Sequence, residues 1–210
     1  MRPPAAPSVQ SWYRRLAGEY DRRWSAYVAA STRETLRRTR VGPADRLLDI
    51  GCGTGALVGA VGRGTPGVRA VGIDLVPAML AVARRKVGAG AQLAAADAER
   101  LPFRAGVFDV AVSSSSFHYW SHPRAALAEI GCVLRPGGRL VLTDWCGDYL
   151  ACRVCDRLLG WFAPIHRRVL GGSECERLLA AAGFVPEALD RYKISWLWGL
   201  MTATASRPAS

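Results

Sequence analysis

Short apolar runs alternate with amphipathic segments along most of this chain, and this alternation predicts its secondary structure. Apolar runs predict strands over residues 46–50, 68–74, 92–95, 107–113 and 139–144. Between them, apolar side chains that recur every three or four positions predict helices over 54–61, over 77–86 and from Pro123 onward. Strands that alternate with helices form a mainly parallel sheet covered by helices. The pattern therefore predicts an α/β fold with a doubly wound sheet and helices on both faces.

The C-terminal third departs from this alternation. A helical insertion is expected over residues 148–169, and Ser173 with Glu176 three residues later has the spacing of a capping box that opens a helix. Gly183 ends that helix. The last segment, 184–205, reads as two long strands that close the sheet as an antiparallel pair. The sheet then has about seven strands, of which the last is antiparallel.

The N-terminal forty residues predict a tail followed by helix. Residues 1–10 are expected to be a flexible tail, and residues 11–206 a single domain. Within 11–40, apolar side chains recur at spacings of three and four: Trp12, Leu16, Tyr20, Trp24 and Tyr27. Two interpretations remain open, namely a helix that packs its aromatic face on the core and a helical lid over a ligand cleft.

The basic character of the chain raises the question of a nucleic-acid partner. Lysine and arginine number 28 against 17 acidic residues, a net charge of +11, and residues 1–40 are rich in arginine. Attraction to nucleic acid and solvated helix faces both fit this composition. Because no extended basic run and no RNA-binding module accompany the arginines, we expect solvated faces and no nucleic-acid partner.

The absence of a membrane span and of a signal peptide indicates the cellular location, and this in turn bears on the state of the cysteines. No apolar run reaches the roughly 18 residues of a membrane helix, and residues 1–10 lack the apolar core of a signal peptide, so we expect a cytoplasmic protein without a membrane span. Six cysteines in that setting argue against a disulfide framework. Cys152 and Cys155 have no second CxxC to complete a metal site, so buried, inert thiols are favoured over binding of a soft metalloid or a thiol substrate.

The candidate chemistry centres on the stretch LLDIGCGTG, residues 47–55. An apolar strand ends at Asp49 and Ile50, and three glycines at alternate positions lead into a helix. Glycine permits positive φ and lets a ligand approach the backbone, while a helix start presents free N–H groups. An acid directly before such a turn suits a ligand that carries both a cation and an anion, such as an amino acid.

Acidic residues stand at the ends of three successive predicted strands: Asp49, Asp74 and Asp97. In doubly wound sheets, ligands bind beyond the carboxyl ends of the strands, near the point where the strand order reverses. A core strand has no need of an acid at its end, so the three point to one cleft. The glycine spacing is not the dinucleotide pattern GxGxxG, and Thr54 is not the lysine of a phosphate-binding loop.

These motifs, together with AADAERLPF around Asp97 and LRPGGRLVLTD over 134–144, resemble the class I S-adenosylmethionine-dependent methyltransferases. The resemblance extends over residues 12–205 and is strongest to the type-11 small-molecule group, which includes ubiquinone and menaquinone methyltransferases. It implies a Rossmann-like fold, S-adenosylmethionine as cofactor and a small, apolar or aromatic metabolite as methyl acceptor.

The resemblance also implies roles for individual residues. Gly51, Cys52 and Gly53 would lie along the methionine part of the cofactor and Asp49 would hold its ammonium. The remaining cofactor contacts would come from Asp74 at the ribose, Leu75 and Met79 at the adenine face, Asp97 and Ala98 at the adenine edge, Ser113 and Ser114 beside the sulfonium, and Tyr20 in YDRRW as a closing aromatic. The competing assignments are a helix N-cap for Asp74, a loop acid for Asp97 and core packing for Tyr20, Leu75 and Met79.

The acceptor is expected after the fourth and fifth strands. Candidate substrate contacts are Phe117, Tyr119, Trp145 and Tyr149, with residues 145–172 as a helical cap. His118 is the candidate base and Asp144 the candidate orienting acid, each with a structural role as the alternative. The expected reaction is direct displacement at the methyl group, in which alignment and water exclusion supply most of the rate. An RNA or protein methyltransferase and a non-catalytic S-adenosylmethionine-binding protein are the alternative functions.

Overall fold

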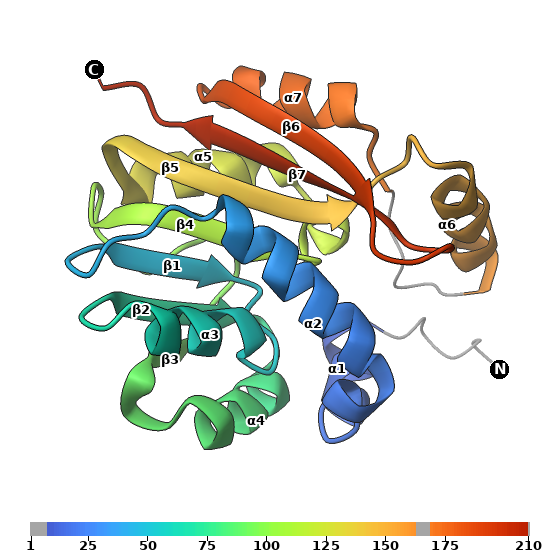
Figure 1. The fold of residues 1–210 in the computed structure, drawn as a ribbon, viewed down its shortest axis with the longest axis horizontal. Coiled ribbons are helices and arrows are strands. Elements are labelled where there is room, and N and C mark those ends of the chain that lie inside the picture. The colour runs from blue at the N-terminus through green and yellow to red at the C-terminus, as the bar shows by residue number, and fades with distance from the viewer. Residues whose placement is uncertain (1–7, 163–168, 210) are drawn as a thin grey trace, which may run out of the picture.

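The computed structural model describes residues 8–162 and 169–209, with residues 159–162 described by their backbone alone. A seven-stranded sheet in the order β3-β2-β1-β4-β5-β7-β6 forms its centre (Figure 1). The strands are β1 (Arg46–Ile50), β2 (Arg69–Asp74), β3 (Gln92–Ala95), β4 (Phe108–Ser114), β5 (Leu134–Trp145), β6 (Val185–Lys193) and β7 (Gly199–Ser206). The helices are α1 (Val9–Leu16), α2 (Tyr20–Arg38), α3 (Ala56–Gly64), α4 (Pro77–Val87), α5 (Pro123–Val133), α6 (Leu150–Phe162) and α7 (Gly172–Ala181), with the short 3-10 helices η1 (Gly88–Gly90) and η2 (Phe117–Tyr119).

Strand direction confirms the predicted sheet. The strands β1 to β5 pair in parallel, whereas β7 lies between β5 and β6 and is antiparallel to both. The order of strands reverses at β1, because β2 lies on one side of it and β4 on the other. That reversal is the place where a doubly wound sheet leaves a crevice at its carboxyl edge.

Two apolar layers hold the helices on the sheet, as the alternation along β1 shows. Leu48 and Ile50 point into the larger core cluster, which includes Leu127 of α5 and Leu179 of α7. Leu47 points the other way, into a cluster shared with α3 and α2. Successive side chains of a strand face opposite sides of the sheet, so a single five-residue strand contributes to both layers.

The N-terminal segment forms two helices, and its boundary differs from the expected one. Residues 8–10, expected in the tail, belong to the start of α1, where Ser8 accepts a hydrogen bond from the N–H of Ser11; residues 1–7 lie outside the described part. Residues 17–19 separate α1 from α2, so the expected aromatic stripe changes phase there. Trp12 consequently lies 45% exposed, and its neighbour Tyr13 points inward.

Two expectations for the C-terminal third are corrected. The strand β5 begins at Leu134, five residues earlier than expected, because the turn at Pro136–Gly138 is absorbed as an irregularity in its pairing with β4. Ser173 does not cap α7, since the N-cap is Gly171 and has no side-chain cap bond. The carboxylate of Asp148 instead accepts the N–H of Gly172 at 3.1 Å. The carboxylate of Asp148, which precedes α6, therefore accepts a backbone N–H at the start of α7 in place of the expected capping box.

Among the described residues, no helix is both long enough and apolar enough to cross a membrane.

Candidate active site

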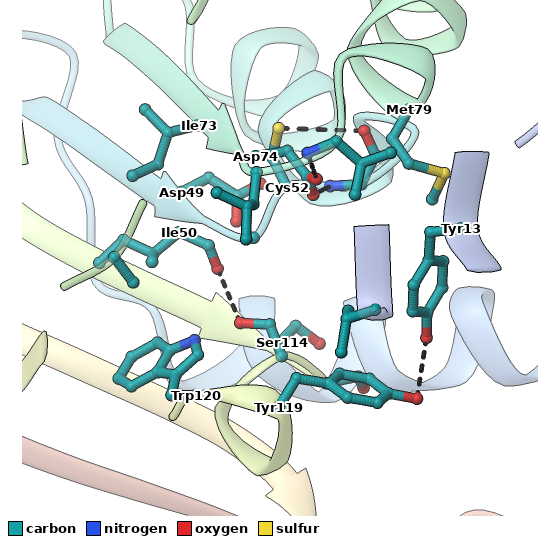
Figure 2. A pocket seen from close by; sticks show the side chains of 18 of the residues that line it. Tyr13, Asp49, Ile50, Cys52, Ile73, Asp74, Met79, Ser114, Tyr119 and Trp120 are labelled. Atoms are coloured by element: carbon teal, nitrogen blue, oxygen red, sulfur yellow. Dashed lines mark hydrogen bonds between the residues drawn. The ribbon is translucent and has the colours of Figure 1, made fainter. Parts of the chain in front are cut away.

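A cavity of about 660 Å³ lies at the carboxyl edge of the sheet, beyond β1, β2 and β4. Helices α1 and α2 supply one wall, and the loop after β4 supplies another (Figure 2). Twelve of the residues predicted from the sequence line it: Tyr20, Asp49, Gly51, Cys52, Gly53, Asp74, Leu75, Met79, Asp97, Ala98, Ser114 and Tyr119. The cavity thus brings together side chains and backbone from segments that are distant in sequence.

The glycine turn after β1 forms the floor of the cavity. The N–H groups of Gly51 and Cys52 both donate to the carbonyl of Ile73, at 2.9 Å each, which ties the turn to β2. Gly51 has φ +72°, and a Cβ there would lie 2.5 Å from the Cβ of Ser116. Only glycine fits this position, because positive φ and a close approach are required together.

Asp74 ends β2 with both carboxylate oxygens engaged. One oxygen accepts the N–H of Gly53 and the other the N–H of Val76, each at 2.8 Å. Burial raises the pKa of Asp74, and these two hydrogen bonds oppose the rise. The N-cap of α4 is Val76, so Asp74 is not a simple helix cap. Each carboxylate oxygen has more than one lone pair, and this fixed carboxylate can accept further bonds from a pair of ligand hydroxyls.

Asp49 lies deeper, 1% exposed, with its carboxylate accepting the N–H of Val58 at 3.1 Å. Burial raises its pKa from 3.8 to about 7, and the negative charge of Asp74 adds to the rise although the Val58 bond opposes it. Two acids close to one another in a cavity wall are stabilised in the ionised form by a cation. The donor set therefore fits the ammonium group of an amino-acid ligand.

The outer end of the cavity contains Asp97, Ala98 and a pair that the sequence did not single out. The carboxylate of Asp97 accepts the N–H of Glu99 at 3.0 Å, which fixes the loop after β3. Glu99 in turn accepts both the N–H and the Nδ1 proton of His122, each at 2.7 Å. Burial would raise the pKa of Glu99, but the bonds from His122 hold it below its ordinary value. Glu99 belongs to the motif AADAERLPF, but no motif included His122 or indicated that the two would pair.

Tyrosines from the N-terminal helices close the cavity. The hydroxyl of Tyr13 donates to that of Tyr119 at 3.0 Å, and the two rings meet edge to face (Figure 2). Tyr27 hydrogen-bonds Ser115 at 2.7 Å, and its hydroxyl accepts the indole N–H of Trp145 at 2.7 Å. Burial raises the pKa of Tyr13 and of Tyr27, which keeps both hydroxyls protonated. The sequence pattern placed Tyr27 in the aromatic stripe but gave no reason to select Tyr13.

The loop between β4 and η2 is strained at the cavity wall. Ser115 has φ +59°, the only positive φ at a described residue other than glycine. Its N–H donates to the carbonyl of Thr143 at 2.8 Å, and its hydroxyl lies within 2.7 Å of that of Tyr27. A strained residue held by such bonds is typical of a functional loop. Within the run SSSS at 113–116, the sequence gives no sign of which serine has the positive φ.

Several predicted residues do not line the cavity. Ser113 points away from it and hydrogen-bonds Ser116 at 2.7 Å, because alternate residues of β4 face opposite sides. Phe117 is 3% exposed and packs against Trp120 in the core. Trp145 does not line the cavity but hydrogen-bonds Tyr27 of its wall, and Tyr149 lies against Gly199. Of the four predicted substrate contacts, the cavity wall includes Tyr119 alone.

His118 and Asp144 form a buried pair behind the wall. The carboxylate of Asp144 accepts the backbone N–H of His118 at 2.9 Å and lies 2.7 Å from its Nδ1. The imidazole stacks on Trp145 at a centroid distance of 5.2 Å. Neither side chain lines the 660 Å³ cavity, and none of the described residues of 145–172 does so; residues 163–168 lie outside the described part. Catalytic roles for the pair and a cap role for this segment stay predictions.

Comparison with known proteins adds to the geometry. The family described as "Methyltransferase domain" matches residues 48–142. The malonyl-[acyl-carrier protein] O-methyltransferase of Paenibacillus sp. (strain JDR-2) is 32% identical over 207 residues, which cover 88% of this chain and 73% of that protein. The demethylmenaquinone methyltransferase of Thermus thermophilus is 41% identical over 103 residues, covering 48% of this chain and 47% of the relative.

The fold has a close structural counterpart. A Haloferax volcanii methyltransferase solved in complex with the activator Trm112 superposes with a TM-score of 0.85 at 20% identity, covering 96% of this chain and 100% of that one. By length, the chain spans 47%, 66% and 56% of three curated relatives that it matches.

Proposed function

We propose that this chain, which belongs to the class I S-adenosylmethionine-dependent methyltransferases of the type-11 group, transfers a methyl group from S-adenosylmethionine to a small apolar or aromatic acceptor in the cytoplasm. The observation that carries the proposal is the convergence of Asp49, Asp74 and Asp97 on one cavity beside the glycine turn. An amino-acid cation, a ribose and an adenine each require a different acceptor, and the three carboxylates are spread along the cavity accordingly.

The residues present fit this cofactor from end to end. Asp49 would neutralise the ammonium group, and its raised pKa indicates that it gains from a cation. Asp74 would accept from the two ribose hydroxyls while Gly53 and Val76 hold it in place. Adenine would lie between Leu75 and Met79, with the Asp97–Ala98 segment at its edge. Leu75 is 41% exposed, an apolar surface that a bound ring would cover.

When bound, the cofactor supplies a methyl group on a positively charged sulfur, which an acceptor attacks in line. The protein's contribution is alignment and the exclusion of water. Tyr20 is largely buried at the cavity wall, and the linked Tyr13 and Tyr119 close the side opposite the glycine turn. The faces of these rings also stabilise a neighbouring cation. Ser114 and Ser115 supply hydroxyls at the end of β4, near the expected site of transfer.

The walls support a small apolar acceptor. Tyr13, Tyr27, Tyr119 and Trp120 supply most of the large side chains of the cavity outside the cofactor contacts. The relatives named above act, by their names, on demethylmenaquinone and on a malonyl group carried by a protein.

We assign His118 and Asp144 a positioning role, because their bonds fix η2 and thereby Tyr119, and we keep the catalytic-base assignment as the alternative.

The basic surface supports the assignment against nucleic acid. Glu34 pairs with Arg33, Arg37 and Arg38, which concentrates three of the N-terminal arginines in a surface network. Arginines that already pair with a carboxylate are poorly placed to neutralise phosphates. These contacts favour a solvated helix face for this part of the charge.

Calorimetric titration with S-adenosylhomocysteine tests the proposal. Asp74→Ala removes the acceptor for two hydroxyls and is expected to weaken binding at least about 100-fold, since hydrogen bonds to a charged group contribute about 1.5–3 kcal/mol each. Glu176→Ala, an acid on α7 outside the cavity, should bind as the unmodified chain does. Normal binding by Asp74→Ala would show that the site is wrongly assigned.

A second measurement separates the enzyme from a cofactor-binding protein. The chain is incubated with methyl-labelled S-adenosylmethionine and a panel of quinols, phenols and carboxylic acids, with RNA and an unrelated protein in parallel. Transfer to a small acceptor supports the proposal. Tight binding of the cofactor with no transfer across the panel would favour the non-catalytic alternative, and transfer to RNA alone would favour the nucleic-acid one.

A further inference from the structure

Helix α6 carries a stripe of apolar side chains that faces outward. Leu150, Val154 and Leu158 are 74%, 48% and 53% exposed. They are spaced four residues apart, so they lie one above the other along the same side of the helix. Single exposed aliphatic residues are ordinary on protein surfaces, whereas a contiguous exposed stripe marks an interaction site.

The opposite side of α6 is seated on the protein, which fixes the outward orientation of the stripe. Cys152 is fully buried, and its thiol lies 3.3 Å from the carbonyl oxygen of Gly199 at the start of β7. Asp156, on the same inner side, accepts the N–H of Val169 at 3.0 Å. Among the side chains of α6 that the structure describes, the inner side holds small or hydrogen-bonded groups and the outer side holds the larger aliphatic ones, the reverse of an ordinary surface helix.

A second exposed apolar group lies on the segment that α6 contacts. Trp196, in the connection between β6 and β7, is 85% exposed. The thiol of Cys152 also approaches the carbonyl of Leu197, the next residue, at 4.0 Å. Figure 1 shows the turn between β6 and β7 running to α6. An exposed indole ring close to a helix with an aliphatic stripe is typical of proteins that enter the interface of a lipid bilayer.

The charges that α6 itself carries beside the stripe have one sign. Arg153 and Arg157 are exposed and lie along the edge of the stripe. Among the described side chains of α6 the single acid is Asp156, which is on the inner side. The whole chain has a net charge of +11. Long arginine side chains at the edge of an apolar stripe can reach lipid phosphates while their stems cover apolar surface.

We propose that the stripe of Leu150, Val154 and Leu158, with Trp196, Arg153 and Arg157, docks this protein on the surface of an anionic lipid bilayer. The helix would lie in the plane of the interface, since no described helix is long and apolar enough to span it. Charge complementarity selects this occupant: the interior of a protein–protein interface is depleted in charge, whereas a bilayer offers apolar depth directly below an anionic layer.

Docking at this position would also assist catalysis; this part of the inference rests on the proposed function. Helix α6 follows the carboxyl end of β5, so it lies at the same edge of the sheet as the cavity. An apolar acceptor dissolved in the bilayer would then reach the cavity without crossing bulk water. The docking itself does not depend on that activity and is tested without it.

Vesicle flotation with the full chain tests the docking. Vesicles of phosphatidylcholine with about 30% phosphatidylglycerol are expected to carry the protein to the top of the gradient at low salt, and pure phosphatidylcholine vesicles much less of it. Arg153→Gln with Arg157→Gln should lower the partition coefficient about 25-fold, because each basic residue near an anionic surface contributes a factor of about five. Leu150→Gln with Leu158→Gln should lower it at least tenfold.

Matched substitutions elsewhere serve as controls. Val185→Gln changes a residue of similar exposure, 51%, at the start of β6 and the other edge of the sheet, and Arg84→Gln with Arg85→Gln removes two arginines from α4. Both should float nearly as the unmodified chain does, the second with only the small loss of long-range attraction. Binding of S-adenosylhomocysteine should be unchanged in every variant, which separates this test from that of the proposed function.

Three outcomes would overturn the proposal. The first is absence from both kinds of vesicle. The second is flotation that all arginine pairs reduce equally, which would indicate diffuse charge rather than this surface. The third is a concentration-dependent dimer, seen by light scattering, that Leu150→Gln with Leu158→Gln dissociates while flotation is unaffected, because the stripe would then be an interface between two copies of the chain.

Discussion

The hydroxyl of Tyr13 donates a hydrogen bond to the hydroxyl of Tyr119 at 3.0 Å, and this bond joins two positions 106 residues apart in sequence. One residue belongs to α1 and the other to η2, so the bond connects the N-terminal helix to the loop that follows β4. The cavity is closed along that line (Figure 2). The N-terminal helix is therefore part of the site wall.

Tyr13→Phe should loosen this closure while preserving the ring contact. A buried hydrogen bond between neutral groups contributes about 0.5–1.5 kcal/mol, so the dissociation constant for S-adenosylhomocysteine should rise about two- to tenfold. Stopped-flow measurement should assign the change to faster release. Tyr192→Phe is the control, because it removes a hydroxyl–hydroxyl contact of 2.7 Å with Thr202 outside the cavity. An equal loss of cofactor affinity in both variants would contradict the lid role of Tyr13.

Cofactor binding should depend on pH through Asp49. Its pKa is about 7 in the unliganded protein because of burial, and a bound ammonium group would hold it ionised. Binding then requires loss of a proton below pH 7, and affinity should fall about tenfold between pH 8 and pH 6. Calorimetry across this range measures the slope. Asp49→Asn should bind more weakly at pH 8 and lose most of the slope; a slope that persists would assign the proton to another group.

The raised pKa of Asp49 favours cofactor binding at high pH, but it favours the stability of the cofactor-free protein at low pH. An acid whose pKa is raised on folding stabilises the folded state fully below its unfolded pKa of 3.8, and that contribution is lost as pH rises through about 7. At pH 8 the folded protein thus carries a buried charge that Asn would not have. Asp49→Asn should therefore raise the melting temperature of the unliganded protein at pH 8. An unchanged or lower melting temperature there would mean that the Asp49 charge is compensated within the protein.

The glycine turn provides a graded pair of substitutions. At Gly51 a Cβ would meet the Cβ of Ser116 at 2.5 Å with φ at +72°, whereas at Gly53 the nearest atom is the flexible end of Met79 at 3.5 Å with φ at +55°. Gly51→Ala should lower the free energy of unfolding by at least about 2–3 kcal/mol, and Gly53→Ala by about 1–2 kcal/mol, which is the backbone cost alone. Denaturant unfolding checks the order. Equal losses would mean that the clash at Ser116 is relieved at no cost.

Asp144→Asn should separate positioning from base catalysis. An amide offers one oxygen acceptor where the carboxylate accepts at both oxygens, so at least one donor of the set formed by His118 and the Trp145 N–H loses its partner. The free energy of unfolding should fall by about 1–3 kcal/mol. With an acceptor identified by the labelling screen, turnover should fall about tenfold while the pH–rate profile keeps its shape. A lost acidic limb of that profile would instead support His118 as the base.

The sheet and the cofactor end of the site were predictable because each follows from short-range rules. The acids at the ends of β1 and β2 and after β3 meet because parallel strands bring their carboxyl ends to one edge. The glycine turn was predictable because only glycine combines positive φ with close contact. Asp49, Asp74 and Asp97 accordingly line the cavity as predicted.

The acceptor end of the site was less predictable because it depends on which of several neighbouring residues face the cavity and which face the core. Ser113 and Ser114 differ only in which face of β4 they occupy, and in a run of four serines the sequence gives no sign of that phase. Phe117 and Tyr119 are two residues apart on one 3-10 turn, and one enters the core while the other enters the cavity. Tyr13 was missed because residues 17–19 shift the helical phase between α1 and α2.

The position of β7 has a consequence for the order in which the molecule is assembled. This strand, Gly199–Ser206, is the last along the chain yet lies between β5 and β6. While the chain is being synthesised, β5 presents an unpaired edge and β6 has no neighbouring strand to pair with. The sheet can therefore be completed only after residue 206 has emerged from the ribosome. Open strand edges template aggregation. The growing chain is therefore most exposed to misassembly in the interval before β7 emerges, and chaperones that shield strand edges would act there.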